Sequence, residues 1–315
     1  MTASVTLWVG FTLFVLVMLA LDLGVFHRKA HVVRMKEALI WSVVWIALSL
    51  VFNAAVYYWF GPEKALEFLT GYVIEKTLSV DNVFVFVVLF GSFAVPREYQ
   101  HRVLFWGVFG ALLMRAAFIA TGAALLAHFH WVIYLFGALL VITAIKLMAE
   151  KGVAVDATKN PLYRLFVKRV RSVPEYDGDK FFTIQNGKRY ATPLFLVLVA
   201  IEATDLVFAV DSIPAIFAVT DDPFIVYTSN VFAILGLRAL YFVLADVVEK
   251  FVYIKPALAF ILGFVGIKML LMDVYKIPIA ASLGVIVAAL AVAIVASALK
   301  RRQLARDGGD DPARQ

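Results

Sequence analysis

The chain has 315 residues, of which 63% are hydrophobic and 17% charged, and its mean hydropathy is +0.89. A soluble domain is about half apolar. The excess here falls in long runs, so the composition excludes an ordinary soluble domain and predicts a protein that crosses a membrane repeatedly. The sequence has no cysteine, which excludes disulfides, iron–sulfur clusters and thiolate metal sites.

Nine apolar runs are long enough to cross a bilayer, which takes about 20 residues. In chain order they lie at about 4–26, 38–60, 66–94, 102–122, 128–149, 190–219, 224–247, 254–272 and 278–299. The first run lacks a preceding basic segment and a small-residue cleavage site, so we expect a retained span and not a signal peptide.

The basic residues between these runs predict the orientation. With the N-terminus outside, every basic residue that lies outside the spans falls in an inner segment, except Lys64 and Lys276. Because basic loops stay in the cytoplasm, the pattern predicts an N-out, C-in topology. The formal net charge of +6 therefore marks topology, and nucleic acid is not an expected partner.

Two parts of the sequence resemble each other. The acidic stretch around Glu75 and Asp81 aligns with the one around Asp205 and Asp211, and 108–118 then aligns with 231–241 and 139–148 with 261–270. Each unit holds three spans, an odd number, so the units enter the membrane from opposite sides. Inverted repeats of this kind are typical of transporters, whose substrate site lies where the repeats meet.

The predicted fold is therefore an all-α polytopic membrane protein with about nine transmembrane helices, built from two inverted three-helix repeats and flanking helices. The expected divisions are two N-terminal helices (1–65), the first repeat (66–150), a cytoplasmic loop (151–189), the second repeat (190–273), the last transmembrane helix (274–300) and a cytoplasmic tail expected to be disordered (301–315).

Polar side chains interrupt the spans in both repeats. A charge at the bilayer centre costs about 2.5–3.5 kcal/mol on insertion scales, so such residues are functional by default. Seven residues make two helical turns, so Glu75 shares a face with Asn82, and Asp205 shares one with Ser212. If the third and sixth spans face each other, their oxygens converge. The candidate metal ligands are Glu75, Asp81, Asn82, Glu202, Asp205, Asp211 and Ser212.

This ligand set consists of oxygen atoms only, which suits hard cations such as Mn²⁺, Mg²⁺ and Ca²⁺. Pro214 should kink the helix beside Asp211 and free a carbonyl that could also bind a cation. Alternatively, the acids form structural salt bridges with intramembrane bases. The candidate charge partners are Arg115, Lys146, Arg238 and Lys268. Asp22, near the inner end of the first span, is a candidate gate, ligand or interfacial acid.

Four stretches resemble the TerC family of integral membrane proteins, most closely its Alx-type members. They are "LDLGVFHRKAH", "WSVVWIALSLVFNAAVYYWFG", "EKTLSVDNVFVFVVLF" and "IEATDLVFAVDSIPAIFAVT", and the resemblance runs from about residue 5 to 300. It implies export of Mn²⁺ from the cytoplasm across a bacterial inner membrane. Carried over by motif, Glu75, Asp81, Asp205 and Asp211 are the ion-site residues, with Asn82 and Ser212 beside them.

The sequence hypothesis is thus an inner-membrane Mn²⁺ exporter that alternates access between its repeats, with protons as a candidate counter-ion and no resident cofactor. No nucleotide-binding loop of the G-x-x-x-x-G-K-[ST] type is present, and we do not expect an enzyme. The alternatives are a Ca²⁺ transporter, or a structural or assembly factor whose acids form salt bridges. An intramembrane aspartyl protease is disfavoured because neither Asp81 nor Asp211 lies in a G-x-G-D sequence.

Overall fold

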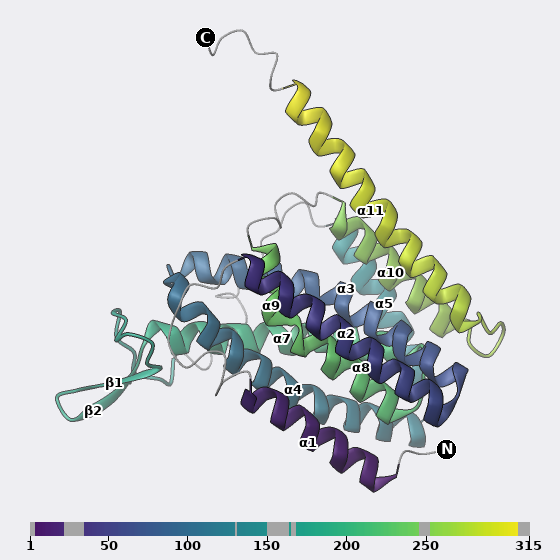
Figure 1. Cartoon of the computed structure of the whole chain (residues 1–315), viewed down its shortest axis with the longest axis horizontal. Coiled ribbons are helices and arrows are strands. Elements are labelled where there is room, and N and C mark those ends of the chain that lie inside the picture. The colour runs from purple at the N-terminus through teal and green to yellow at the C-terminus, as the bar shows by residue number, and fades with distance from the viewer. Residues whose placement is uncertain are drawn as a thin grey trace.

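The computed structural model describes residues 4–21, 35–129, 131–149, 164, 168–245 and 253–307, and it is mostly helical (Figure 1). Asp22 and most of the expected cytoplasmic loop lie outside these ranges. The elements are α1 (Val5–Leu21), α2 (Met35–Phe60), α3 (Pro62–Ser92), α4 (Arg97–His128), α5 (Val132–Ala149), β1 (Phe182–Gln185), β2 (Lys188–Ala191), α7 (Pro193–Phe217), α8 (Pro223–Leu235), α9 (Leu237–Leu244), α10 (Ile254–Leu270) and α11 (Ile279–Asp307).

Six helical segments of the described chain are long and apolar enough to cross a membrane: α2, α4, α5, α7, the α8–α9 pair and α11. This confirms an α-helical polytopic architecture. The nine-span count stays a prediction, because α1 and α10 are each described over only 17 residues and α3 carries several charges. A helix that carries those charges must bury them among its neighbours to lie at membrane depth.

Helices α3, α4, α7 and α8 form the centre of the bundle. α3 packs against α7 and α8, and α4 packs against the same two helices. α8 is buried along nearly all of its length, and its Phe232 contacts Phe11 of α1 and Phe52 of α2. α1 and α2 line the outside and turn apolar side chains such as Val43 outward, as expected of a lipid-facing surface.

α5 and α10, the last helices of the two expected repeats, pack closely because each brings a glycine to the contact. A Cβ added at Gly137 would lie 3.0 Å from the Gly266 carbonyl oxygen, and one added at Gly266 would lie 2.8 Å from the Gly137 carbonyl oxygen. Small residues at helix contacts in membranes let the backbones approach in this way. α11 packs on α10 and extends beyond the bundle to Asp307, inside the segment 301–315 (Figure 1).

The expected span 224–247 is not one continuous helix. α8 ends at Leu235, Gly236 directs its N–H to the Ile234 carbonyl, and α9 begins at Leu237. By contrast, α7 runs through Pro214 and ends at Phe217 shortly after it. Broken helices at membrane depth are typical of transporter sites.

A β-hairpin precedes α7 and projects from one end of the bundle (Figure 1). β1 and β2 pair antiparallel, with Phe182 opposite Ala191, and the turn uses Asn186 and Gly187 at positive φ. The strand β2 explains why α7 begins at Pro193 and not at residue 190. The Tyr176 hydroxyl donates to the Phe93 carbonyl at 2.7 Å and so ties this segment to the α3–α4 turn.

Candidate functional site

A buried arginine lies at the centre of the bundle. Arg115 of α4 is only 2% exposed, and its guanidinium pairs with Glu75 of α3 and Asp205 of α7. The Nη1 group donates to Glu75 Oε1, while Nε and Nη2 donate to the two oxygens of Asp205 at 3.4 and 3.2 Å. One cation therefore bridges two carboxylates that come from the two expected repeats.

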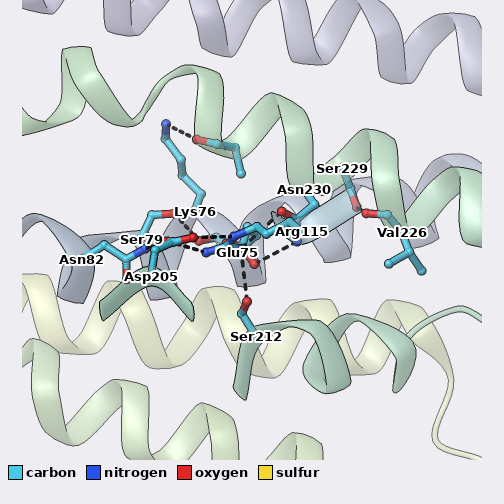
Figure 2. A network of polar contacts seen from close by, with 11 residues as sticks. Glu75, Lys76, Ser79, Asn82, Arg115, Asp205, Ser212, Val226, Ser229 and Asn230 are labelled. Atoms are coloured by element: carbon cyan, nitrogen blue, oxygen red, sulfur yellow. Dashed lines mark hydrogen bonds and ion pairs between the residues drawn. The ribbon is translucent and has the colours of Figure 1, made fainter. Parts of the chain in front are cut away.

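Three neutral polar side chains complete this network, which we call the Arg115 cluster (Figure 2). Arg115 Nη1 also donates to Ser212 Oγ at 3.1 Å and to Asn230 Oδ1 at 3.2 Å. Asn230 Nδ2 donates to Glu75 Oε2 at 3.3 Å, and Asn82 Nδ2 donates to Asp205 Oδ1 at 3.3 Å. The cluster comprises Glu75, Asn82, Arg115, Asp205, Ser212 and Asn230, all buried.

The spacing of the two acidic motifs positions these residues. Glu75 and Asn82 lie two turns apart on one face of α3, and Asp205 and Ser212 do the same on α7. Since α3 and α7 pack together, the two faces meet and Arg115 enters between them from α4. With one guanidinium and two carboxylates, the cluster has a formal charge of −1 when all three groups are ionised.

A cavity of about 80 Å³ lies beside the cluster. Liquid water occupies about 30 Å³ per molecule, so the cavity has room for two or three waters or one partly hydrated ion. Asp211 of α7 lines it and accepts a hydrogen bond from Thr143 Oγ1 of α5 at 2.9 Å. The full lining is Glu75, Leu78, Asn82, Arg115, Thr143, Leu147, Phe208, Asp211, Ser212 and Leu262.

Three of the sequence candidates lie elsewhere or outside the description. Glu202 of α7 lies against α4, where a Cβ added at Gly110 would be 2.0 Å from Glu202 Oε1. In the described part of the chain, the Glu202 carboxylate has no hydrogen-bond partner. Asp81 belongs to α3, but its side chain is outside the described residues, and Asp22 is outside them entirely.

Of the four candidate charge partners, the structure brings Arg115 alone into the described cluster. Arg238 of α9 lies at the α2 contact, near Glu37 and Trp41. Lys268 of α10 lines an outer cavity with Glu67. Lys146 of α5 makes no direct ion pair with a described carboxylate. Arg115 and Arg238 align in the sequence repeat, but they therefore lie in different places in the structure.

Sequence reasoning missed two members of this site. Asn230 lies in an apolar run of α8, and Thr143 lies in an apolar run of α5. A polar residue inside a span was the available signal, since it needs a partner in the bundle. Among the described side chains, no three His, Asp or Glu residues form a group that could hold a metal ion.

Two larger cavities open toward opposite ends of α3. One of about 380 Å³ adjoins the end of α3, with Gly91, Arg97 and Gln100 in its lining. The other, of about 680 Å³, adjoins the start of α3 and includes Glu67 and Thr220. The Thr220 hydroxyl donates to Glu67, which ties α3 to the segment after α7. The predicted topology places the first cavity on the cytoplasmic side and the second outside.

Fold and site together define a polytopic helical membrane protein with a buried ionic cluster at the meeting of several helices. The model of the integral membrane protein TerC family matches residues 60–305. This chain belongs to the TerC family.

Relatives of the chain are similar over nearly their full length. It is 55% identical to "Uncharacterized membrane protein STKORF319" of Myxococcus xanthus, over 97% of this chain and 96% of that protein. It is 50% identical to "Putative membrane-bound redox modulator Alx" of Escherichia coli K12, over 93% of this chain and 94% of that protein. No solved structure matches the chain.

Proposed function

We propose that this protein exports a hard divalent cation, with Mn²⁺ as the expected substrate, from the cytoplasm across the bacterial inner membrane. The cavity beside Asp211 is the observation that supports this proposal most. Its lining includes five residues with side-chain oxygens, a ligand type that suits Mn²⁺, Mg²⁺ and Ca²⁺: Glu75, Asn82, Thr143, Asp211 and Ser212. An ionisable side chain that faces a cavity within the membrane is costly and by default marks an ion pathway.

The Arg115 cluster fits this function as the ion-free state of the site. In it, the guanidinium pairs with both Glu75 and Asp205, which would otherwise repel each other. An arriving divalent cation competes with Arg115 for these carboxylates, so its binding loosens the tie between α3 and α7. Release of the cation restores the ion pairs, which returns the carrier to its starting state.

The packing of α3, α4, α7 and α8 supports alternating access between inverted repeats. α3 contacts α8 in the way that α7 contacts α4, and α5 contacts α10, as the predicted repeat relates them. The cavities near the two ends of α3 supply a route to each side. Protonation of a carboxylate weakens cation binding, so exchange of Mn²⁺ for protons is the coupling that we propose.

A structural or assembly role is the second candidate, because Arg115 caps Glu75 and Asp205 directly. Buried ion pairs of this kind fix a packing arrangement without requiring a transported ion. Redox modulation, which the printed name of the Escherichia coli relative gives, belongs to that protein. The present sequence has no cysteine and therefore no thiol for such chemistry.

Mn²⁺ uptake into inside-out vesicles tests the transport proposal, with Asp211→Asn as the decisive variant. Asparagine keeps an oxygen that accepts from Thr143 and removes only the charge. We expect wild-type vesicles to accumulate Mn²⁺ and the variant to lose that uptake at unchanged abundance and thermal stability. Asp177→Asn, a change in the exposed segment before the hairpin, is the matched control.

Two results would overturn the transport proposal. One is wild-type uptake no greater than that of vesicles without the protein. The other is normal uptake by Asp211→Asn, and in that case the structural role is favoured if Arg115→Met destabilises the protein. Competition of Mn²⁺ uptake by Ca²⁺ or Mg²⁺ in the same vesicles then ranks the three cations.

A further inference from the structure

Lys76 is a second cation inside the bundle; its side chain is half-buried, and it lies outside the Arg115 cluster. It follows Glu75 in α3, but its side chain points away from the cluster toward the ribbon of α8 (Figure 2). Lys76 Nζ donates to the backbone carbonyl of Ala233 at 3.3 Å. Within the described chain it forms no ion pair with a carboxylate, so a backbone carbonyl is its assigned partner.

The break between α8 and α9 explains why a carbonyl is available there. α8 ends at Leu235, so Ala233 lies in its last turn, where carbonyl groups lack the usual partners of a continuing helix. The end of a helix also carries partial negative charge, which favours a cation. Transporters use helix ends to coordinate Na⁺ or protons at membrane depth.

The surrounding residues leave room for an ammonium group. A Cβ added at Gly236 would lie 2.6 Å from Lys76 Nζ and 3.3 Å from the Cβ of Trp45. A side chain at position 236 would thus displace the ammonium group. Glycine at the break therefore does more than interrupt the helix, because its missing side chain is part of the space that Lys76 occupies.

A neutral oxygen is the described partner of the ammonium group. Trp45 of α2 lies beside Gly236, and the Ala233 carbonyl accepts the hydrogen bond from Lys76. Glu37 and Arg238, which have opposite charges, line a small cavity between α2 and α9. The described contacts of Lys76 therefore include no carboxylate, which distinguishes this position from the site beside Asp211.

We propose that the Lys76 ammonium group acts as a tethered monovalent cation at the α8–α9 break, in a position that a free monovalent cation fills when the lysine is removed. The partner of Lys76 is a neutral carbonyl oxygen, which matches a single positive charge, whereas the proposed divalent site uses carboxylates. This has a consequence for transport, which rests on the proposed function. The exporter requires neither Na⁺ nor K⁺ for transport, because the protein carries its own cation at this point.

Thermal unfolding of the purified full-length protein in detergent tests the position itself. In choline chloride, whose cation is too large for the position, we expect Lys76→Met to lower the unfolding midpoint by about 3–6 °C, through loss of a charged hydrogen bond. Methylammonium chloride, which restores an ammonium group, should raise the midpoint again with saturation. KCl and NaCl show whether an alkali ion can replace it.

Lys64→Met is the matched control, because Lys64 lies on the same helix as Lys76. Lys64 pairs with Glu67 at the outer end of that helix. Neither this control nor the wild-type protein should respond to methylammonium. If Lys76→Met cannot be purified, Lys76→Gln, which is shorter and uncharged, must show the same saturable response. The proposal is overturned if no monovalent cation raises the unfolding midpoint of the Lys76 variant. It is also overturned if the Lys64→Met control and the wild type respond as strongly as that variant.

The unfolding experiment does not depend on transport, so its failure is distinguishable from failure of the proposed function. In vesicles, Mn²⁺ uptake by the wild type should be equal in choline, Na⁺ and K⁺. Lys76→Met should lose about tenfold in initial rate in choline and regain it in methylammonium. A wild-type rate that requires Na⁺ or K⁺ would contradict the tethered-cation role even where Mn²⁺ transport is established.

Discussion

Arg115 holds Asp205 by two hydrogen bonds, with Nε donating to Oδ2 at 3.4 Å and Nη2 donating to Oδ1 at 3.2 Å, while Nη1 remains for Glu75. This geometry uses the planar fork of the guanidinium, which a lysine ammonium cannot reproduce. The cluster therefore depends on an arginine at position 115 and not merely on a positive charge.

Replacing Arg115 with methionine should lower the free energy of unfolding by about 3–5 kcal/mol, because two buried carboxylates lose their counter-charge. Chemical unfolding of the detergent-solubilised protein measures this loss. Adding Glu75→Gln to Arg115→Met should recover part of the stability, since one uncompensated charge is then removed. A double variant that is no more stable than Arg115→Met would show that the carboxylate charge is not the cause.

The contact between α5 and α10 predicts a second stability effect. Gly266→Ala should destabilise the protein by about 1–3 kcal/mol, because its Cβ would lie 2.8 Å from the Gly137 carbonyl oxygen and the helices would have to separate. Gly284→Ala is the matched control, since a Cβ there meets nothing within 4 Å and alanine favours a helix. Equal stability changes for the two variants would show that the close contact is not formed.

The position of Glu202 can be tested by a double-mutant cycle with Gly110. A Cβ at position 110 would displace the Glu202 carboxylate, so Gly110→Ala should forfeit most of the roughly 1 kcal/mol that alanine gains over glycine inside a helix. The same substitution should be more favourable when Glu202 is already alanine, because the two changes share one space. Strict additivity of the two unfolding free energies would place Glu202 away from Gly110.

Asp177, in the segment before the hairpin, should titrate at low pH. Hydrogen bonds from Thr183 and Lys180 hold the pKa of its carboxyl below the ordinary value near 3.8. A depressed pKa means that this contribution to hairpin stability is present above about pH 3.8 and is lost as pH falls through the folded-state pKa. Carboxyl-carbon NMR measures the titration, and Thr183→Ala should move it upward, whereas Thr121→Ala should not.

The spacing of the acidic motifs predicted the shared faces of Glu75 with Asn82 and of Asp205 with Ser212. Helical periodicity carries this information, because seven residues always return to nearly the same face. The choice of Arg115 over Arg238 could not be predicted. The two arginines align in the sequence, but the break at Gly236 ends α8 and leaves Arg238 on a separate helix at the α2 contact.

The break itself has a weak sequence signal. A glycine in an apolar run is tolerated inside a helix, so Gly236 alone does not predict an interruption. What distinguishes Gly236 is that Lys76 of α3 approaches it. The Lys76 ammonium group donates to the carbonyl of Ala233, which lies 157 positions later in the sequence. Likewise, Asn230 and Thr143 acquire their roles only through packing. Whether the oxygens of Asp81 and Asp211 bind an ion stays a prediction.

The location of Arg115 on α4 has a consequence for the biosynthesis of the protein. Glu75 is 40 residues before Arg115, whereas Asp205 is 90 residues after it. α3 and α4 are consecutive, so they can enter the bilayer together as a hairpin in which glutamate and arginine neutralise each other before α7 has been translated. The order of the residues along the chain thus spares the insertion machinery from placing either charge alone in lipid.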